Sequence, residues 1–291
     1  AIAVSLVPAL AGAQEFPTRP VKLVLPFAAG GISDVMGRLV AQEMQKTLGQ
    51  PIVPENRVGA GSALGTDAVA KADPDGYTMC YCGNAAITLL PHMNQTVPYD
   101  PLKDFAPVTL IATSPSLLVV HPSLPVRTIR DLVALAKSKP GAINYASAGN
   151  GSSMHLAAEL YQKMTGTKMR HIPYVSPGLA TQDTIANRTQ LIFHLLPAIA
   201  QQALAGNVRA LAVLSSTRSA VLPDVPTTKE AGMPGLEAGT WYTVLAPAGT
   251  PKSVIARLNK EINGFLNDPA FRKRVTDMGI TVMGGTPEDV T

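Results

Sequence analysis

Two glycine-containing loops, each joining a strand to a helix, are the segments of this sequence best suited to hold a small anion. The first is Pro26-Phe-Ala-Ala-Gly-Gly-Ile-Ser-Asp34, and the second is Ala146-Ser-Ala-Gly-Asn-Gly-Ser-Ser-Met-His155. Glycines let the backbone approach a ligand, and the free N–H groups at a helix start favour negative charge. Two such helix starts that face each other would hold a carboxylate with backbone amides and hydroxyl groups.

A third loop, Gly83-Asn-Ala-Ala86, follows a cysteine-containing strand and is expected at the same edge of the fold. The candidate ligand contacts from the three loops are Phe27, Gly30, Gly31, Ile32, Ser33, Asp34, Asn84, Ala86, Ser147, Gly149, Ser152, Ser153 and His155. Nothing near His155 in the sequence would make it a base. We therefore assign no catalytic residue.

Several of these residues also have purely structural explanations. Ser33 or Asp34 could be the N-cap of the first helix, and Asp34 is placed to pair with Arg38 four residues later. A carboxylate at Asp34 would also repel an anionic ligand. Ser152 could serve as a cap, and the His155 side chain could be held within the first turn of its helix.

The segment Gly59-Ala-Gly-Ser-Ala-Leu-Gly65 resembles a dinucleotide-binding fingerprint and supports an alternative function, an NAD(P)-dependent oxidoreductase. Such a loop should leave its strand directly, whereas Glu55-Asn-Arg57 intervenes here. The sequence has no Gly-x-Ser-x-Gly elbow, no His-Glu-x-x-His motif and no Walker loop. We therefore expect a protein that binds without catalysing a reaction and without a cofactor.

Apolar β-rich runs alternate with helical patterns along most of the chain, which predicts an α/β fold with parallel sheets. Residues 21–26 form the first expected strand, and a helix with one apolar face follows and ends at Gly49. Two separate strands are expected at residues 107–112 and 117–121. Further along, Thr128-Ile-Arg-Asp131 has the pattern of a capping box.

The series of elements divides near Pro122 and again near Thr240. This division predicts one lobe from residues 15–122 plus 241–291, and a second lobe from residues 123–240. A chain that crosses twice between lobes has a natural hinge, and a crevice between lobes is a common place for a small ligand. We expect the lobes to close about this hinge.

The charge distribution narrows the class of partner. The 291 residues carry 24 basic and 20 acidic side chains, for a formal charge of +4. These charges are scattered singly, without the Lys and Arg clusters that a phosphate backbone needs, which argues against nucleic acid. A modest positive balance suits a protein that gathers small anions, and we expect it to be a monomer.

Residues 1–10 form an apolar run that leads to Ala11-Gly-Ala13, the small-residue pattern of a signal-peptide cleavage site. We interpret residues 1–14 as the remnant of a signal peptide, with the mature protein beginning near Gln14 or Glu15. Export to the periplasm follows from this interpretation. At the other end, Thr286-Pro-Glu-Asp289 has the pattern of a helix start.

Cys80 and Cys82 are the only cysteines in the sequence. At this spacing both would lie on one face of a strand, which predicts two buried free thiols and no normal disulfide. Two thiols without nearby histidines do not provide the four ligands of a zinc site. We therefore expect no metal site.

From about Phe16 to its end, the chain resembles the Bug family, the substrate-binding proteins of tripartite tricarboxylate transporters. The likeness rests on the order of many short motifs, which are Pro26 to Asp34, Glu55-Asn-Arg-Val-Gly-Ala-Gly61, Asp73-Pro-Asp-Gly-Tyr77, Asn144-Tyr-Ala-Ser147, Gly149-Asn-Gly-Ser152, His171-Ile-Pro-Tyr174, Val208-Arg-Ala-Leu-Ala-Val213, Leu222-Pro-Asp-Val-Pro-Thr227 and Ala246-Pro-Ala-Gly-Thr-Pro251.

The resemblance implies two Rossmann-like α/β lobes with a hinge and an interdomain cleft, as in type 2 periplasmic binding proteins. It implies a small carboxylate ligand, such as a di- or tricarboxylate, an amino acid or an aromatic acid, which is delivered to the membrane permease subunits of the transporter. The implied anchors are Gly30, Gly31, Ile32, Ser33, Ser147, Gly149, Ser152 and Ser153. A ligand-sensing accessory of a membrane signalling protein is a further alternative.

Overall fold

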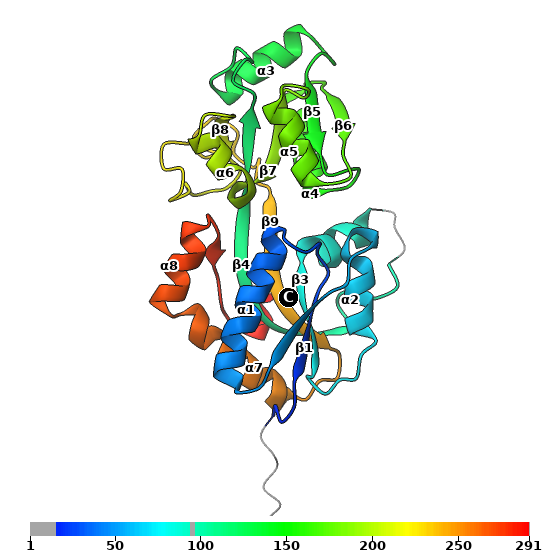
Figure 1. Cartoon of the computed structure of the whole chain (residues 1–291). Helices are drawn as coiled ribbons and strands as arrows, with labels where there is room; N and C mark the ends of the chain where they lie inside the picture. The colour runs from blue at the N-terminus through cyan, green and yellow to red at the C-terminus, as the bar shows by residue number, and fades with distance from the viewer. Residues whose placement is uncertain (1–15, 94–96, 291) are drawn as a thin grey trace, which may run out of the picture.

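Two α/β lobes, joined by two long strands, make up residues 16–93 and 97–290, the part of the chain that this computed structural model describes (Figure 1). The predicted signal peptide remnant, residues 1–14, lies outside the described residues. None of the helices in the described ranges is long and apolar enough to cross a membrane.

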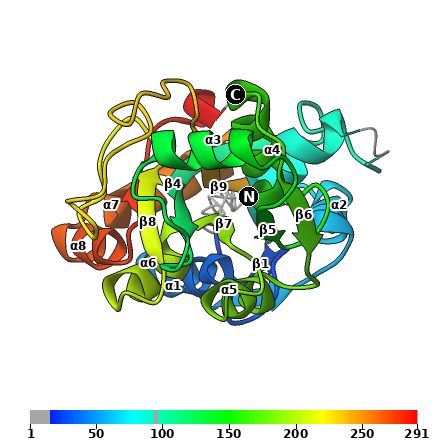
Figure 2. The same ribbon diagram turned by 90° about the horizontal axis from the view of Figure 1, so that it is seen from above.

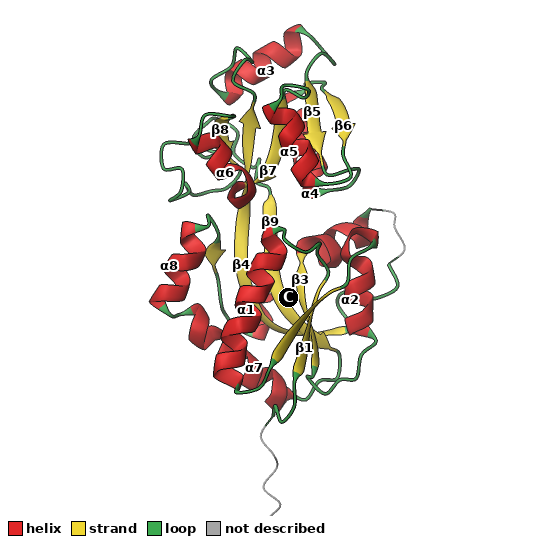
Figure 3. Ribbon diagram, viewed as in Figure 1, coloured by secondary structure: helices red, strands yellow, loops and turns green. Residues whose placement is uncertain are grey.

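Each lobe has its own sheet and its own helices (Figure 3). The elements of the first lobe are β1 (Val21–Leu25), α1 (Ile32–Leu48), β2 (Ile52–Asn56), α2 (Ala63–Ala70), β3 (Thr78–Gly83), α7 (Lys252–Leu266), α8 (Pro269–Asp277) and β10 (Thr281–Val282), with short helical turns at Ala60–Ser62, Ala85–Leu89, Leu90–His92 and Pro287–Val290. Those of the second lobe are α3 (Ile129–Ser138), β5 (Asn144–Ser147), α4 (Ser153–Thr165), β6 (Arg170–Pro173), α5 (Pro177–Ile185), β7 (Leu191–Leu195), α6 (Leu196–Leu204) and β8 (Arg209–Val213).

The two lobes are connected by the strands β4 (Phe105–Val120) and β9 (Gly239–Pro247). The prediction of two separate strands at residues 107–112 and 117–121 is therefore wrong, because one continuous strand covers both. β4 pairs with β9 as far as Pro115 and with β7 from Ser116 onward. Proline favours an extended residue before it and lacks an N–H, so it fits a position where the strand changes partners.

The first crossing between lobes thus lies at Pro115–Ser116, several residues before the predicted boundary at Pro122. The second lies where β9 begins, at Gly239, close to the predicted boundary near Thr240. The crossing strands also make the sheets mixed, because β9 runs antiparallel to β3 and β4 runs antiparallel to β7.

Strand direction decides which edges of the two sheets face each other. β4 runs from the first lobe to the second, β9 runs back, and β3, β1 and β2 run in the direction of β4. β7 runs opposite to β4, and β5 and β6 are parallel to β7. The carboxyl ends of β1 to β3 therefore face the second lobe, and those of β5 to β7 face the first. All three predicted site loops follow such strand ends (Figure 1).

Helices cover both faces of each sheet, as the view from above illustrates (Figure 2). In the first lobe, α1, α7 and α8 pack on one face, with Met36, Leu258 and Phe271 in the core, while α2 packs on the other through Val69. In the second lobe, α3 and α4 cover one face and α5 and α6 the other. The strands and helices that carry the site loops are therefore held in place by buried apolar side chains on both faces of each sheet.

The helix ends follow the local sequence signals. Gly49 and Gly166 adopt left-handed conformations, with φ of 70° and 63°, and end α1 and α4 as a C′ glycine does. The capping box predicted at Thr128 and Asp131 is confirmed, since each side chain bonds the backbone N–H of the other residue.

Cys80 and Cys82 form a disulfide, so the prediction of two free thiols is wrong. Their Cα atoms are 5.3 Å apart, which is shorter than two steps along a fully extended strand and lies within the usual range for a disulfide. Both residues are fully buried, between the first lobe's sheet and α2.

The two crossing strands leave no space for a side chain at Gly239. A Cβ atom placed there would lie 2.4 Å from the Ser114 carbonyl oxygen. We predict that Gly239→Ala lowers the free energy of unfolding by about 1–3 kcal/mol, the usual cost of overpacking. Gly264→Ala in α7 is the control, since a Cβ there meets nothing within 4 Å, and it should stabilise by about 0.5–1 kcal/mol. Urea unfolding of both variants measures this, and equal stabilities would contradict the tight crossing.

Candidate functional site

The loop after β1 presents unpaired backbone donors at the start of α1. Gly31 is the N-cap residue and α1 has no side-chain cap, so the interpretation of Ser33 or Asp34 as the cap is wrong. The N–H groups of Ile32, Ser33 and Asp34 donate to no described residue. A Cβ at Gly31 would touch only the Ala28 carbonyl oxygen, at 3.5 Å, so the loop is open to a ligand. Unpaired first-turn amides of this kind form a site for an anion.

Asp34 supports this loop from beneath. Its side chain is buried and accepts hydrogen bonds from the Gly30 N–H at 2.9 Å, from Asn56 Nδ2 at 2.8 Å and from Arg38 Nε at 3.0 Å. The predicted pair with Arg38 is thus confirmed. Asn56 Nδ2 also donates to the Phe27 carbonyl oxygen at 3.0 Å, so it ties the loop to β2. Asp34 holds the loop in shape, and its carboxylate oxygens are engaged by these donors.

Burial alone would raise the pKa of Asp34, but the hydrogen bonds from Asn56, Gly30 and Arg38 outweigh it and hold the pKa below its ordinary value. The carboxylate is therefore ionised at neutral pH. Its negative charge offsets the positive charge of Arg38. The positive potential at the loop therefore comes from the backbone N–H groups at the start of α1.

Three aromatic rings lie under the same loop. The Ser33 hydroxyl and the Tyr242 hydroxyl are 2.8 Å apart, and Tyr242 stacks on Tyr81 with ring centres 5.2 Å apart. Phe27 packs edge-on against both tyrosines. Burial raises the pKa of Tyr242 to about 12, so it stays a neutral partner that orients Ser33. Sequence reasoning missed Tyr242 because 209 residues separate it from Ser33.

The loop after β5 also ends in unpaired amides, at the start of α4. Ser152 is confirmed as the N-cap, because its hydroxyl oxygen accepts from the His155 N–H at 3.3 Å. The same hydroxyl donates to the Gly149 carbonyl oxygen at 2.8 Å, so its single hydrogen is already used. The N–H groups of Ser153 and Met154 donate to no described residue. The free donors of this loop therefore come one position later than Ser152.

A stack of three rings fixes the shape of the second loop. The rings of Tyr145, His155 and His171 are nearly parallel, and the centre of His171 lies 4.8 Å from Tyr145 and 4.2 Å from His155, while Tyr145 and His155 are 6.4 Å apart. His155 Nδ1 accepts from the Gly151 N–H at 3.1 Å, and His171 Nε2 lies 2.6 Å from the Ser147 hydroxyl oxygen. The proposal that His155 is held within the first helical turn is confirmed.

Burial, together with the neighbouring His155, lowers the pKa of His171, and Glu159 opposes this shift. His171 is therefore mainly neutral at neutral pH and can share a hydrogen bond with Ser147. Sequence reasoning did not assign His171 to the site, although it begins the motif that ends at Tyr174.

The third loop points toward the hinge. Asn84 Nδ2 donates to the Gly239 carbonyl oxygen at 3.2 Å, and its Oδ1 accepts from the Thr240 hydroxyl at 2.7 Å. Ala86 is buried, and its carbonyl oxygen accepts from the Tyr99 hydroxyl at 2.8 Å. Ligand contact by Asn84 and Ala86 stays a prediction.

The lobes also touch away from the hinge, beside the second site loop. The Met93 methyl group lies so close to Gly151 that a Cβ added at Gly151 would be 2.4 Å from it. Met93 belongs to the first lobe and Gly151 to the second, so this contact spans the space between the facing sheet edges.

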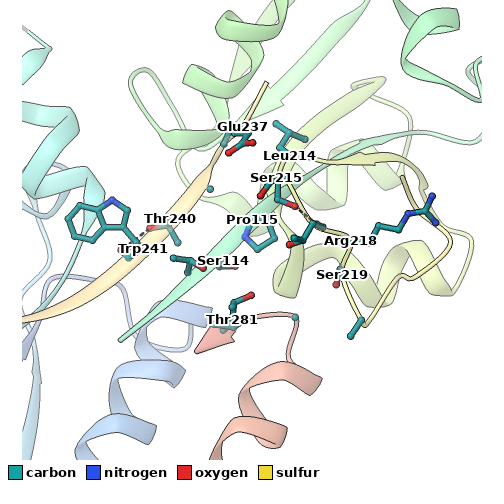
Figure 4. Close-up of a pocket in the computed structure, with 18 of the residues that line it drawn as sticks. Ser114, Pro115, Leu214, Ser215, Arg218, Ser219, Glu237, Thr240, Trp241 and Thr281 are labelled. Carbon is teal, nitrogen blue, oxygen red and sulfur yellow. Dashed lines mark hydrogen bonds between the residues drawn. The ribbon is translucent and has the colours of Figure 1, made fainter. Parts of the chain in front are cut away.

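A cavity of about 560 Å³ lies at the hinge (Figure 4). Its lining includes Ser114 and Thr240 on the crossing strands, the loop around Arg218 that follows β8, and Thr281 on β10. β4 stands between β9 and β7 in the strand order, and β10 and β8 also pair with β4. None of the predicted site residues lines it.

Among the described residues there is no group of three or more His, Cys, Asp or Glu side chains that could hold a metal ion. The glycine segment at residues 59–65 follows the edge strand β2, and α2 begins only at Ala63. A Cβ at Gly65 would lie 2.6 Å from the Arg57 carbonyl oxygen, so close packing accounts for this glycine.

Residues 36–291 match the sequence model of the family described as "Tripartite tricarboxylate transporter family receptor". The chain belongs to this family. Protein BugT of Bordetella pertussis is 38% identical over 292 residues, which cover 99% of this chain and 88% of BugT. A Pseudomonas protein encoded in the tcbD-tcbE intergenic region is 40% identical over 94% of this chain and 82% of its own length.

Solved structures of receptor-family proteins share the two-lobed fold. An R. palustris protein with adipate has a TM-score of 0.86 and 36% identity, covering 95% of this chain and 92% of that one. MatC from Rhodopseudomonas palustris with bound malate has a TM-score of 0.81 and 34% identity, covering 92% and 91%. The structure described as periplasmic binding protein BugD has a TM-score of 0.83 and 35% identity, covering 94% of this chain and 92% of that one. The comparisons give no support to the dinucleotide alternative.

The Asp34 network predicts an acid-sensitive component of stability. Because its pKa is lowered in the folded state, Asp34 stabilises the protein above its unfolded pKa of about 4, and this stabilisation disappears as the pH falls through the lowered value. Asp34→Asn should cost about 1.5–3 kcal/mol at neutral pH and reduce the loss of stability on acidification.

Urea unfolding from about pH 7 down to about pH 2 measures this difference. Asp224→Asn is the control, because Asp224 is exposed and its side chain makes no hydrogen bond to a described residue. If Asp34→Asn kept the wild-type pH profile, the carboxylate would not support the loop.

Proposed function

We propose that this protein is a periplasmic solute-binding protein that captures a small carboxylate between its lobes and delivers it to the membrane permease of a tripartite tricarboxylate transporter. The observation that carries the proposal is the pair of helix starts with unpaired amides, α1 at Ile32 and α4 at Ser153, on facing edges of the two lobes. Backbone amides at a helix start are suited to hold an anion.

The supports around these donors favour a carboxylate over a neutral ligand. In the first loop, the amides of Ile32, Ser33 and Asp34 are unpaired, while the Asp34 carboxylate is engaged by three donors. In the second loop, the amides of Ser153 and Met154 are unpaired. An anion gains from both helix starts, whereas a neutral amide of the same shape gains much less.

The relatives support the same ligand class. The receptor-family structures solved with adipate and with malate hold carboxylates, at 36% and 34% identity to this chain. In this chain we propose that residues 16–113 with 241–290 move as one lobe against residues 117–237, about a hinge at residues 114–116 and 238–240. We also propose that the protein acts as a monomer and that it catalyses no reaction. The identity of the carboxylate depends on groups beyond the anchor.

A thermal-shift screen of mono-, di- and tricarboxylates tests the proposed ligand class. A true ligand at about 100 times its Kd should add about 2.7 kcal/mol of stability. The neutral amides of the same skeletons should give little or no shift, because they lack the charge that the helix starts attract. Equal stabilisation by acids and amides would contradict carboxylate recognition.

Substitutions at two neighbouring serines distinguish a role in ligand binding from a role in capping the helix. The Ser152 hydroxyl is committed to Gly149 and His155, whereas the Ser153 hydroxyl bonds to no described residue. Ser153→Ala should weaken carboxylate binding about ten- to a hundredfold with little change in stability. Ser152→Ala should lower the free energy of unfolding by about 1 kcal/mol through loss of the cap.

Calorimetric titration with the best carboxylate of the screen, together with urea unfolding, gives both quantities for each variant. Should Ser153→Ala bind as tightly as the wild type, its hydroxyl is not part of the anchor.

A further inference from the structure

A row of polar side chains crosses three neighbouring strands at the hinge. Asn84 follows the end of β3, Thr240 lies near the start of β9, and Ser114 lies on β4, in the strand order β3-β9-β4. Ser114 and Thr240 are direct partners in the antiparallel pairing of β4 and β9. This row lies where the chain passes between the lobes, and Figure 4 labels its two members on the crossing strands.

The Thr240 hydroxyl, in the middle of this row, is hydrogen-bonded to Asn84 at one end. It donates to Asn84 Oδ1 at 2.7 Å, and Asn84 Nδ2 donates back to the Gly239 carbonyl oxygen at 3.2 Å. Asn84 belongs to the loop at the carboxyl end of β3, on the edge that faces the second lobe. A residue at the edge of the ligand cleft is therefore fastened to the hinge strand.

The other end of the row is a buried hydroxyl without a partner. Ser114 is 1% exposed, and its Oγ makes no hydrogen bond to a described residue. Most buried polar groups are paired, so an exception calls for an explanation. Directly opposed residues in an antiparallel pair have Cβ atoms about 4.5–5.5 Å apart on the same face. The Thr240 hydroxyl is therefore a partner that a small rotation could bring to Ser114.

The present arrangement is one with the lobes in contact, because Met93 reaches Gly151 across the space between them. We propose that Asn84, Thr240 and Ser114 form a two-position hydrogen-bond switch in the hinge. The Thr240 hydroxyl bonds Asn84 when the lobes are together, and it bonds Ser114 when they swing apart. Asn84 is then a positioning residue that links the cleft edge to the hinge. The link to ligand affinity rests on the proposed function, whereas the switch itself does not.

The proposed switch predicts that two conservative substitutions shift the equilibrium between open and closed lobes in opposite directions. Ser114→Ala removes the partner used only when the lobes are apart, so it shifts the unliganded protein toward the closed arrangement. Asn84→Ala removes the bond of the closed arrangement and shifts the protein toward the open one. A net hydrogen bond corresponds to a change of about two- to tenfold in this equilibrium. If Ser114 were merely an unpaired buried hydroxyl, its removal would leave the equilibrium unchanged.

Energy transfer between dyes on the two lobes measures this equilibrium without any ligand. Cysteines introduced at Leu102 in the first lobe and Leu204 in the second carry the dyes, since both side chains are well exposed and the native cysteines form a buried disulfide. Thr113→Val is the matched control, because it removes the neighbouring hydroxyl on β4, whose one hydrogen-bond partner among the described residues is the Met283 sulfur at 3.9 Å. This control should leave the dye distribution unchanged.

The second readout is the dissociation rate of adipate, used as the probe. We expect Ser114→Ala to slow adipate release and Asn84→Ala to speed it, by about two- to tenfold each. In a Thr240→Val background, Ser114→Ala should have no further effect, because the shared hydroxyl is gone. An unchanged dye distribution in Ser114→Ala, or an equal effect in both backgrounds, would overturn the switch.

The two proposals fail in distinguishable ways. If no carboxylate stabilises the wild-type protein, the proposed function is wrong, while the dye measurement still decides the switch. If adipate binds but Ser114→Ala leaves the dye distribution and the release rate unchanged, the switch is wrong and the carboxylate function stands.

Discussion

The close packing of β4 against β9 at the crossing between lobes is the constraint on which the rest of the structure depends. The two strands approach so closely at Ser114 and Gly239 that no Cβ fits between them. Because β4 continues unbroken from one sheet into the other, it sets the direction of every strand in both lobes. That direction turns the carboxyl ends of β1 to β3 and of β5 to β7 toward each other, and it thereby creates two facing helix starts.

In this site, the groups that can donate hydrogen bonds to a ligand differ from the groups that hold the loops in shape. The unpaired amides at Ile32 and Ser153 are available to a ligand, while charged and aromatic groups hold the two loops in shape. In the first lobe this support is an ionised, buried Asp34, and in the second it is the group of near-parallel rings of Tyr145, His155 and His171. Both designs leave the anchor without a lysine or arginine side chain of its own, so its field comes from aligned peptide dipoles. A rigid, weakly charged anchor suits a protein that must release its ligand as well as bind it.

Local signals in the sequence predict local structure well. Gly49 and Gly166 end their helices, Ser152 caps α4, and Asp34 pairs with Arg38, all from contacts within a few residues. Two errors are local: the two cysteines come close enough for a disulfide within β3, and α1 begins at Gly31 without a side-chain cap. The other errors arise where distant strands decide the outcome. Two predicted strands are one, because β4 gains new partners beyond Pro115. Asn56, Tyr242 and His171 were not assigned to the site for the same reason, since each acts on a loop from another strand.

The lobes touch on both sides of the crossing strands, and this limits how the hinge can move. On the side of the site loops, Met93 contacts Gly151, and on the side of the hinge cavity a Cβ at Gly279 would lie 2.3 Å from the Leu196 side chain. The Leu196 contact joins α6 of the second lobe to the segment after α8 of the first, and the cavity in Figure 4 is likewise lined by both lobes. Any rotation of the lobes would have to keep or break both contacts, because closely packed interfaces do not deform continuously.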